Sequence, residues 1–245
     1  MTSLCSLPKD LLVSGYWDGT IILYRLGSSE NDNHLKLREG GCAFLSLCNL
    51  SNNSLASGFE DGNIMMWDVR KIGDSWNLSG HKGGVSSLCD ASTFQIVSGS
   101  YDMTLRVWNK LDGQCLHVLV GHEGPIYSLC CLNEGSIASG SWDKAIKVWN
   151  IIDGSCIHTL IGHEGSVTSL CCLQYGRLAS GSADIFVMIW DMSSCQCDFF
   201  LEGHEEEIIA LCSLDDGGLV SGSVESDKRL LRPDLSSREF QDSWS

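Results

Sequence analysis

Short apolar segments separated by polar turns run along the chain, and the stretch from Gly121 to Leu160 shows the pattern clearly. Its apolar and small-residue runs predict four short strands, over residues 126–131, 136–141, 145–150 and 156–161. The third run, AIKVWN, alternates apolar and polar residues as a half-exposed strand does. Turn signals such as Asn133-Glu134-Gly135 and Asp153-Gly154 lie between the runs. Because no ten-residue segment has helical periodicity, we expect a unit of four strands and three turns.

A Ser-Gly pair, followed by a polar turn and an apolar strand, recurs six times. The pairs begin at Ser14, Ser57, Ser98, Ser139, Ser180 and Ser221, so the first interval is 43 residues and the next four are 41. A period near 40 indicates a repeat architecture, either a β-propeller or a stacked β-solenoid, whose coils are shorter at about 20–30 residues. We therefore predict an all-β propeller of about six four-stranded blades in a single domain, with repeats over residues 1–38, 39–79, 80–120, 121–161, 162–202 and 203–245.

The charge balance and the apolar stretches argue against nucleic-acid and membrane partners. The chain has 245 residues with 16 basic and 31 acidic side chains, a net charge of −15, and 43% of its residues are apolar. No basic patch that would displace counterions from a nucleic acid is present, so no nucleic-acid partner is expected. The longest apolar stretch, Ile185 to Trp190, is too short for a membrane span, and the N-terminus, MTSLCSLPKD, lacks the features of a signal peptide. These features predict a cytoplasmic protein, with the nucleus as the alternative, and no membrane partner.

Thirteen cysteines raise the question of disulfides or metal. Five fall one period apart and Cys5 precedes them by 43 residues; the five are Cys48, Cys89, Cys130, Cys171 and Cys212. Equivalent places in different repeats should not pair with each other, so we expect small buried hydrophobes at strand contacts. The pairs Cys130-Cys131 and Cys171-Cys172 lack the C-x₂-C spacing of structural zinc sites, and no phosphate-binding loop occurs. No metal or other cofactor is therefore expected.

Three repeats carry a histidine, a serine, an aspartate and a tryptophan at fixed spacing. The sets are His81, Ser98, Asp102 and Trp108; His122, Ser139, Asp143 and Trp149; and His163, Ser180, Asp184 and Trp190. Serine, histidine and aspartate together suggest a hydrolase. A catalytic site occurs once, however, whereas this set occurs three times, and there is no G-x-S-x-G motif. We therefore expect no enzyme.

Gly-His pairs and Trp-Asp or Trp-Asn pairs accompany these sets. The pairs are Gly80-His81, Gly121-His122, Gly162-His163 and Gly203-His204, with Trp67-Asp68, Trp108-Asn109, Trp149-Asn150 and Trp190-Asp191. Together they resemble the WD-repeat (β-transducin-like) propeller family. The resemblance implies that tryptophan, serine, histidine and aspartate form a structural chain of hydrogen bonds within each blade. Loss of one such aspartate is expected to cost roughly 1–3 kcal/mol.

The terminal repeats depart from this pattern. Gly40 stands where repeat two should have histidine, and Tyr24 replaces the tryptophan of repeat one. In repeat six Glu225 replaces the aspartate and Leu231 the tryptophan. WD-repeat propellers usually close by pairing an N-terminal strand into the last blade. Here we expect closure by residues 238–245, or else an incomplete ring.

The resemblance also points to a partner-binding face. On it should lie the residue before each turn aspartate: Trp17, Glu60, Tyr101, Trp142 and Ala183, with Val224 before Glu225. The residues flanking the first apolar residue after Gly-His should join them: Ala43 and Leu45, Gly84 and Ser86, Pro125 and Tyr127, Ser166 and Thr168, Glu207 and Ile209. Aromatic residues at turn tips suit binding hot spots. The set has no Arg or Lys, which argues against phosphopeptide recognition.

These features predict a non-enzymatic scaffold that binds a protein or peptide on its aromatic-rich face. A first alternative is a substrate adaptor or ligase-associated propeller of the ubiquitin system, suggested by a loose likeness in the Cys-Cys strands and the G-S-W-D-K turn. Alternatives from other classes are a Ser-His-Asp hydrolase and a redox or metal sensor that uses the cysteines.

Overall fold

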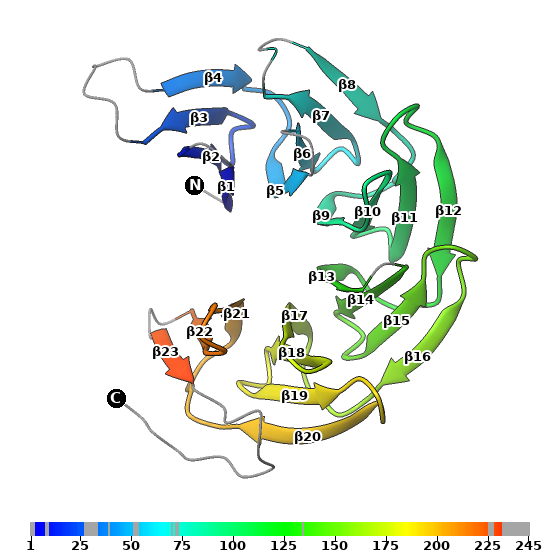
Figure 1. The fold of residues 1–245 in the computed structure, drawn as a ribbon, viewed down its shortest axis with the longest axis vertical. Coiled ribbons are helices and arrows are strands. Elements are labelled where there is room, and N and C mark those ends of the chain that lie inside the picture. Colours follow the sequence, from blue (N-terminus) through cyan, green and yellow to red (C-terminus); the bar gives the residue numbers. More distant parts are fainter. Residues whose placement is uncertain are drawn as a thin grey trace. The chain divides into compact units, whose positions relative to one another are not determined.

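Antiparallel sheets follow one another in chain order (Figure 1). The computed structural model describes residues 3–7, 10–26, 34–38, 40–50, 54–69, 71, 74–133, 135–224 and 228–231, the last four as backbone only. Each of the six sheets lies within one predicted repeat, so we number them as blades 1 to 6. The chain divides into two compact units, Met1–Val120 (unit 1) and Gly121–Ser245 (unit 2).

Unit 1 holds blades 1 to 3, each a four-stranded sheet with its strands in sequence order. Blade 1 consists of β1 (Ser3–Leu7), β2 (Leu11–Gly15), β3 (Ile21–Arg25) and β4 (His34–Arg38). Blade 2 consists of β5 (Phe44–Leu50), β6 (Ser54–Phe59), β7 (Ile64–Asp68) and β8 (Ser75–Leu78). Blade 3 consists of β9 (Val85–Asp90), β10 (Gln95–Ser100), β11 (Thr104–Asn109) and β12 (Cys115–Val120).

Unit 2 holds blades 4 to 6. Blade 4 consists of β13 (Ile126–Asn133), β14 (Ser136–Ser141), β15 (Ile146–Asn150) and β16 (Cys156–Leu160). Blade 5 consists of β17 (Val167–Leu173), β18 (Arg177–Ser182), β19 (Val187–Asp191) and β20 (Gln196–Leu201). Blade 6 has three strands among the described residues: β21 (Ile208–Ser213), β22 (Leu219–Ser223) and β23 (Lys228–Leu231). The predicted all-β fold of repeated four-stranded sheets is confirmed, whereas the proposed closing segment 238–245 and Glu225 lie outside the described residues.

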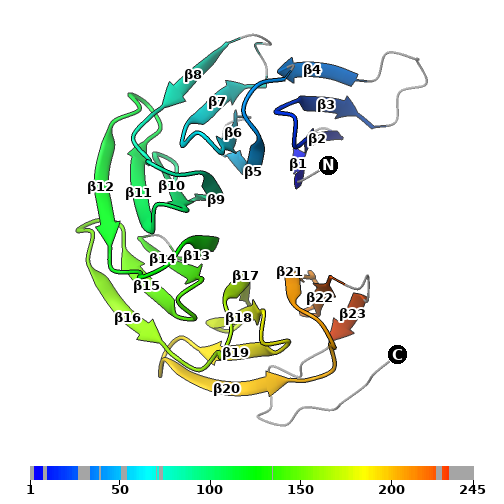
Figure 2. The same cartoon turned by 180° about the vertical axis from the view of Figure 1, so that it is seen from behind.

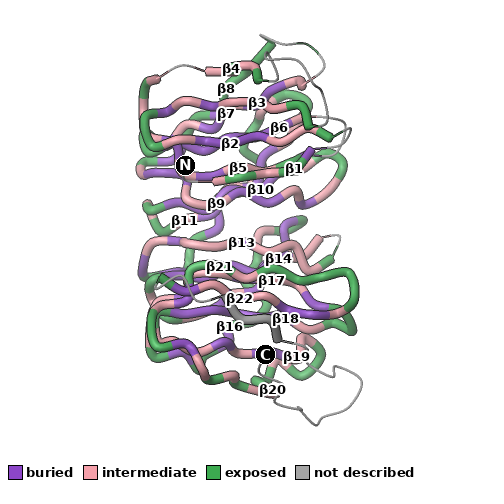
Figure 3. The backbone as a smooth tube through the Cα atoms, turned by 90° about the vertical axis from the view of Figure 1, so that its left-hand side faces the viewer, coloured by how far each residue is buried: buried purple, intermediate pink, exposed green. Residues whose placement is uncertain are grey.

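The second strand of each central blade is the most deeply buried. In β6, β10, β14 and β18 every residue after the first is buried. Figure 3 colours the backbone by burial, with buried residues in purple. Both faces of these strands are covered, which explains their run of small residues such as SIASGS. The hydrophobic core lies between neighbouring sheets: Trp108 of blade 3 packs with Ile64 and Met66 of blade 2. In unit 2, Trp190 of blade 5 packs with Ile146 of blade 4 in the same way.

The glycine of the Ser-Gly pair in blades 4 and 5 lies against the first strand of the next blade. The first strands of neighbouring blades, such as β5 and β9, lie side by side in Figures 1 and 2. A Cβ atom at Gly140 would lie 2.6 Å from Cγ1 of Val167, the first residue of β17. At Gly181 it would lie 2.5 Å from Cγ2 of Ile208, the first residue of β21. The glycine therefore admits the first apolar side chain of the next blade.

The turn between the second and third strands is built alike in blades 1 to 5. In blade 4 the N–H of Lys144 donates to the Ser141 carbonyl over 3.2 Å. The donor residue has a positive φ in each blade: Gly19 (84°), Gly62 (83°), Met103 (67°), Lys144 (71°) and Ile185 (71°). Glycine takes this left-handed conformation freely, whereas other residues are strained by about 1–2 kcal/mol. Blades 1 and 2 thus use glycine where blades 3 to 5 do not.

Candidate functional site

A chain of hydrogen bonds joins tryptophan, serine, histidine and aspartate in blades 3, 4 and 5. In blade 4 the Trp149 indole N–H donates to Ser139 Oγ (2.8 Å), and Ser139 Oγ lies 2.7 Å from His122 Nε2. His122 Nδ1 lies 2.7 Å from Asp143 Oδ2. Because a carboxylate can only accept, Nδ1 carries the proton and Nε2 accepts from the serine. Blades 3 and 5 repeat this chain through the other two predicted sets.

The two oxygens of the turn aspartate have different tasks. Asp143 Oδ1 accepts the N–H of Ala145 (3.0 Å), which fixes the turn, and all of blades 1 to 5 have this bond. Asp143 Oδ2 accepts from His122 and from the Glu123 N–H (2.9 Å), which ties the turn to the loop before the first strand. In blade 2, Asp61 keeps the Oδ1 bond to the Asn63 N–H, while Gly40 occupies the histidine position.

The serine after the Ser-Gly pair is part of the same framework, and the sequence did not single it out. Ser141 Oγ donates to the Gly124 carbonyl (3.0 Å) and accepts the Asp143 N–H (3.1 Å). The corresponding position holds Ser100 and Ser182 in blades 3 and 5, but Tyr16 and Phe59 in blades 1 and 2. The contrast between S-G-S and S-G-Y or S-G-F was therefore the signal that could have revealed this role.

Blades 1, 2 and 6 keep only parts of the chain. In blade 2 the Trp67 indole N–H donates to Ser57 Oγ (2.8 Å). In blade 1 the Tyr24 hydroxyl stands in place of the indole and lies 3.0 Å from the Tyr16 hydroxyl. In blade 6, His204 Nε2 lies 2.7 Å from Ser221 Oγ. The side chain of Leu231 is not described.

Burial keeps the histidines neutral, and hydrogen bonds keep the aspartates ionised. Burial lowers the pKa of His81, His122 and His163 below the ordinary 6.5, and attraction to the aspartates offsets only part of this effect. Burial would raise the pKa of Asp102, but hydrogen bonds from Thr104, the Lys82 N–H and His81 outweigh it and lower the pKa to about 2. The pKa values of the other two aspartates are lowered in the same manner. Neutral histidine therefore faces ionised aspartate at neutral pH.

We expect stability to fall on acidification below about pH 6.5. The unfolded histidines bind protons there while the folded ones resist them, so their stabilisation is complete above pH 6.5 and is lost as pH falls through the lowered pKa values. Urea unfolding midpoints at about pH 7.5 and about pH 5.5 measure the loss. The His122→Gln variant should be less stable at both pH values but less sensitive to pH. Equal midpoints for the unmodified protein at both pH values would contradict this expectation.

The three serines are closed to substrates. Ser98, Ser139 and Ser180 are fully buried, and each hydroxyl is engaged by an indole and an imidazole. A nucleophilic serine must reach a substrate carbonyl, so this arrangement suits structure and not acyl transfer. Within the described ranges, no group of three His, Cys, Asp or Glu side chains is placed to hold a metal ion. The described part of the chain also contains no helix long and apolar enough to cross a membrane.

In unit 1 the predicted partner-binding residues lie at exposed turn tips. Trp17 is 66% exposed, Tyr101 is 42% exposed, and Glu60 is exposed too. The Tyr101 N–H donates to the Gly84 carbonyl (2.9 Å), and a Cβ at Gly84 would lie 3.2 Å from Tyr101 Cδ2 and 2.7 Å from Leu45 Cδ1. The two predicted groups of loop residues therefore meet around Gly84.

In unit 2 the same arrangement surrounds Trp142. Trp142 is 58% exposed, its backbone N–H donates to the Pro125 carbonyl (2.9 Å), and its side chain covers Gly124. Ala183 is exposed and its N–H donates to the Ser166 carbonyl (2.9 Å). Tyr127 is half-buried and offers less surface than Trp142.

Comparison with known proteins bears on the identity of these repeats. The family model described as WD domain, G-beta repeat matches residues 74–109, 113–150 and 154–191, which are the central repeats that carry the full hydrogen-bond chain. The crystal structure of the WD40 beta propeller domain of Doa1 is similar, with a TM-score of 0.83 and 25% identity, over 96% of this chain and 79% of that chain. The chain belongs to the WD-repeat family. A computationally designed protein, Ika8, is also similar, with a TM-score of 0.80 and 30% identity, over 98% of this chain and 72% of its own. No curated protein matches the chain.

Membership of the WD-repeat family gives the geometry its general meaning. WD-repeat propellers generally act as scaffolds for protein interactions and generally lack enzymatic activity. The buried hydrogen-bond chains supply the rigid framework, and the loops between strands are free to vary. The exposed turn residues are therefore the candidate functional site.

Proposed function

We propose that this WD-repeat chain is a non-enzymatic scaffold that binds a protein or peptide segment, with Trp142 as the anchor in unit 2. The proposal is supported by one observation above others: Trp142 is 58% exposed although it sits at the tip of a fixed turn. Turn tips usually carry small or polar residues. An indole is mostly apolar surface, which is unfavourable to leave in water. When a partner covers a large exposed aromatic ring at such a place, the burial of its apolar surface stabilises the complex.

The framework beneath Trp142 reduces the entropic cost of binding. The backbone N–H of Trp142 donates to the Pro125 carbonyl. The next residue, Asp143, is held by His122 and by two backbone N–H groups. A side chain on a rigid turn loses little freedom when a partner arrives. Tyr101 has the equivalent position in unit 1 and offers a second anchor there.

The charges near Trp142 favour a segment with basic residues. Glu123, whose N–H is bonded to Asp143 Oδ2, is exposed beside the Trp142 turn. Glu164 has the same place in blade 5, and the whole chain has a net charge of −15. Charge complementarity of this kind mainly speeds association and improves selectivity. We therefore propose a partner segment that places an apolar residue on Trp142 with Lys or Arg nearby.

The test is an affinity pull-down from cell extract with the immobilised protein, followed by titration of the recovered partner. Trp142→Ala should weaken binding by about 2 kcal/mol, roughly thirtyfold, because the anchor is lost. The double variant with Tyr101→Ala should recover no more partner than Trp142→Ala alone. Tyr175→Ala is the matched control, since Tyr175 is 76% exposed in the turn between β17 and β18, outside the proposed set. Equal recovery by the unmodified protein and the double variant would discard the site.

Two further attributes are part of the proposal. We infer an intracellular location, supported by the free thiol state of all thirteen cysteines, each within the described ranges. A role as substrate adaptor in the ubiquitin system stays a prediction. It shares the peptide-binding face proposed above, so the recovered partner would distinguish it from other scaffolds.

A further inference from the structure

The first strands of blades 4, 5 and 6 lie side by side, but residues that face each other across two strands are not at equivalent repeat positions. The Leu170 N–H of β17 donates to Ser128 Oγ of β13 (2.9 Å). The Leu211 N–H of β21 donates to Ser169 Oγ of β17 (3.0 Å). Each bond joins residues 42 apart, one more than the period of 41. A residue on one first strand therefore faces, on the next blade, the residue one place after its equivalent repeat position.

This shift brings two cysteine side chains together. Two residues beyond the Ser128–Leu170 bond, it pairs Cys130 of β13 with Cys172 of β17, and these two thiols are close enough to interact electrostatically. At the next step the same shift pairs Cys171 with Ser213, which lowers the pKa of Cys171 in part. At the first step the facing residue is therefore itself a cysteine, whereas at the second step it is a serine.

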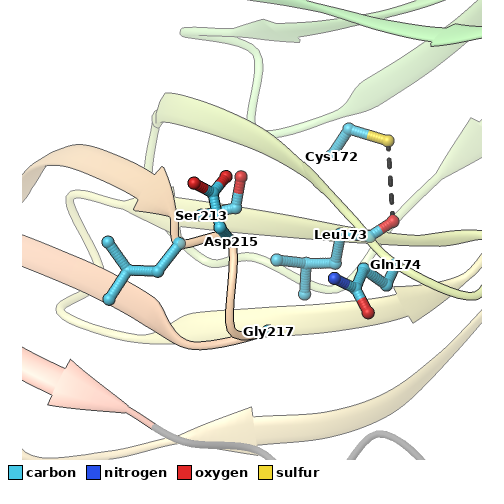
Figure 4. Close-up of a pocket in the computed structure, with 7 residues that line it drawn as sticks. Cys172, Leu173, Gln174, Ser213, Asp215 and Gly217 are labelled. Atoms are coloured by element: carbon cyan, nitrogen blue, oxygen red, sulfur yellow. Dashed lines mark hydrogen bonds between the residues drawn. The ribbon is translucent and has the colours of Figure 1, made fainter.

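Cys172 is accessible from two cavities. One, of about 340 Å³, lies between blades 5 and 6 and is lined by Cys172, Gln174, Ser213 and Asp215, as Figure 4 shows. The other, of about 220 Å³, lies between blades 4 and 5 and has Cys172 and His158 in its lining. Cys130 lines neither cavity. A small molecule in water can therefore approach Cys172 first.

The two cysteines also differ in the pKa of their thiols. The interaction with Cys130 lowers the pKa of Cys172 to about 7, whereas the same interaction and burial raise the pKa of Cys130. The thiolate is the reactive form of cysteine, and a thiolate with a neighbouring thiol is the usual arrangement of a peroxide-sensitive pair.

We propose that Cys172 and Cys130 are a peroxide-reactive pair whose disulfide links the first strands of blades 4 and 5. The Cys172 thiolate attacks one oxygen of hydrogen peroxide, the O–O bond breaks, and hydroxide leaves. Cys172 becomes a sulfenic acid. Cys130 gives up its proton and attacks the Cys172 sulfur, the S–O bond breaks, and water leaves with that proton. The two sulfurs lose two electrons in total, and the peroxide gains them.

The strand geometry is compatible with this bond. Residue pairs of β13 and β17 have Cα atoms within 8 Å of each other. A disulfide spans a Cα separation of about 4.4–6.8 Å. Because β13 and β17 already pack side by side, the bridge requires only a short approach of the two strands. It would hold two blades of unit 2 in place through their first strands.

Hydrogen peroxide itself is the probe for the test. The reduced protein is treated with peroxide, the remaining thiols are blocked with N-ethylmaleimide, and tryptic peptides are analysed by mass spectrometry without reduction. We expect a cross-linked species that joins peptides 111–144 and 148–177 and lacks two hydrogens. It should disappear in Cys130→Ser and in Cys172→Ser, but persist in the matched controls Cys131→Ser and Cys171→Ser.

Each outcome decides the proposal. In Cys130→Ser, dimedone should trap a sulfenic acid on Cys172, because the second thiol is missing. Circular dichroism of each variant checks that its strands are intact. The cross-link in the unmodified protein is a test that depends on no substitution. Absence of the cross-link in the unmodified protein, or its persistence in Cys172→Ser, would overturn the proposal.

Discussion

Asp143→Ala is expected to lower the free energy of unfolding by about 3 kcal/mol. The substitution removes the acceptor of the His122 Nδ1–H and of the Glu123 and Ala145 N–H groups. His122 is buried, so its N–H finds no water to replace the carboxylate. A buried donor left without an acceptor costs about 1–3 kcal/mol, and the lost turn bond adds to this. Urea unfolding at neutral pH measures the change.

Asp61→Ala in blade 2 is the matched control. Asp61 has the same turn bond through Oδ1, to the N–H of Asn63, but Gly40 occupies the place of the histidine. We expect a loss of about 1 kcal/mol there, the usual net contribution of one hydrogen bond. The difference between the two variants isolates the bonds made by Oδ2. Equal losses would mean that the histidine chain does not stabilise blade 4.

Gly140→Val is expected to destabilise unit 2 by about 3 kcal/mol or more. Even the first added carbon would lie 2.6 Å from Val167 Cγ1 and 3.2 Å from the Val167 carbonyl oxygen. β14 cannot move away without losing the hydrogen bonds that join it to β13 and β15. Extra carbons in a well-packed contact cost about 1–3 kcal/mol, and valine adds two beyond the first. Thermal unfolding of the purified variant measures the loss.

A double-mutant cycle identifies the cause of that loss. Val167→Ala removes the Cγ1 atom that the new side chain would strike. Gly140→Ala should therefore cost less in the Val167→Ala background than in the unmodified protein, with a coupling of about 1 kcal/mol. Additive effects would show that the close approach of the blades is not what requires glycine at this position.

The sequence predicts the strands of blade 4 almost residue by residue. The predicted range 136–141 coincides with β14, and the predicted 126–131 extends by two residues to Asn133 in β13. Such accuracy has a physical cause: every repeat presents the same alternation of turns and apolar runs, so six copies define one pattern. The histidine, serine and aspartate at fixed spacing belong to the same pattern, and they form the hydrogen-bond chain that the family resemblance implies.

A repeat pattern does not predict contacts between blades, because these depend on the register of neighbouring sheets. The spacing of 41 residues makes Cys130 equivalent to Cys171, and only the packed first strands reveal that Cys130 meets Cys172. Exposure is a second example. Trp142 and Tyr127 both belong to the predicted face, yet the first is 58% exposed and the second is half-buried. A repeat pattern gives the position of a residue within a blade, but its exposure depends on the neighbouring side chains.

The left-handed residue of the turn after the second strand has a consequence for how such repeats change over time. Blades 3 to 5 accept a strained Met103, Lys144 or Ile185 there, and in each of them histidine and aspartate hold the turn. Blades 1 and 2 have Gly19 and Gly62, which need no such support. One and the same turn can thus be kept by either means. We therefore expect a repeat to tolerate loss of its histidine with less damage to the turn when glycine already occupies the left-handed position.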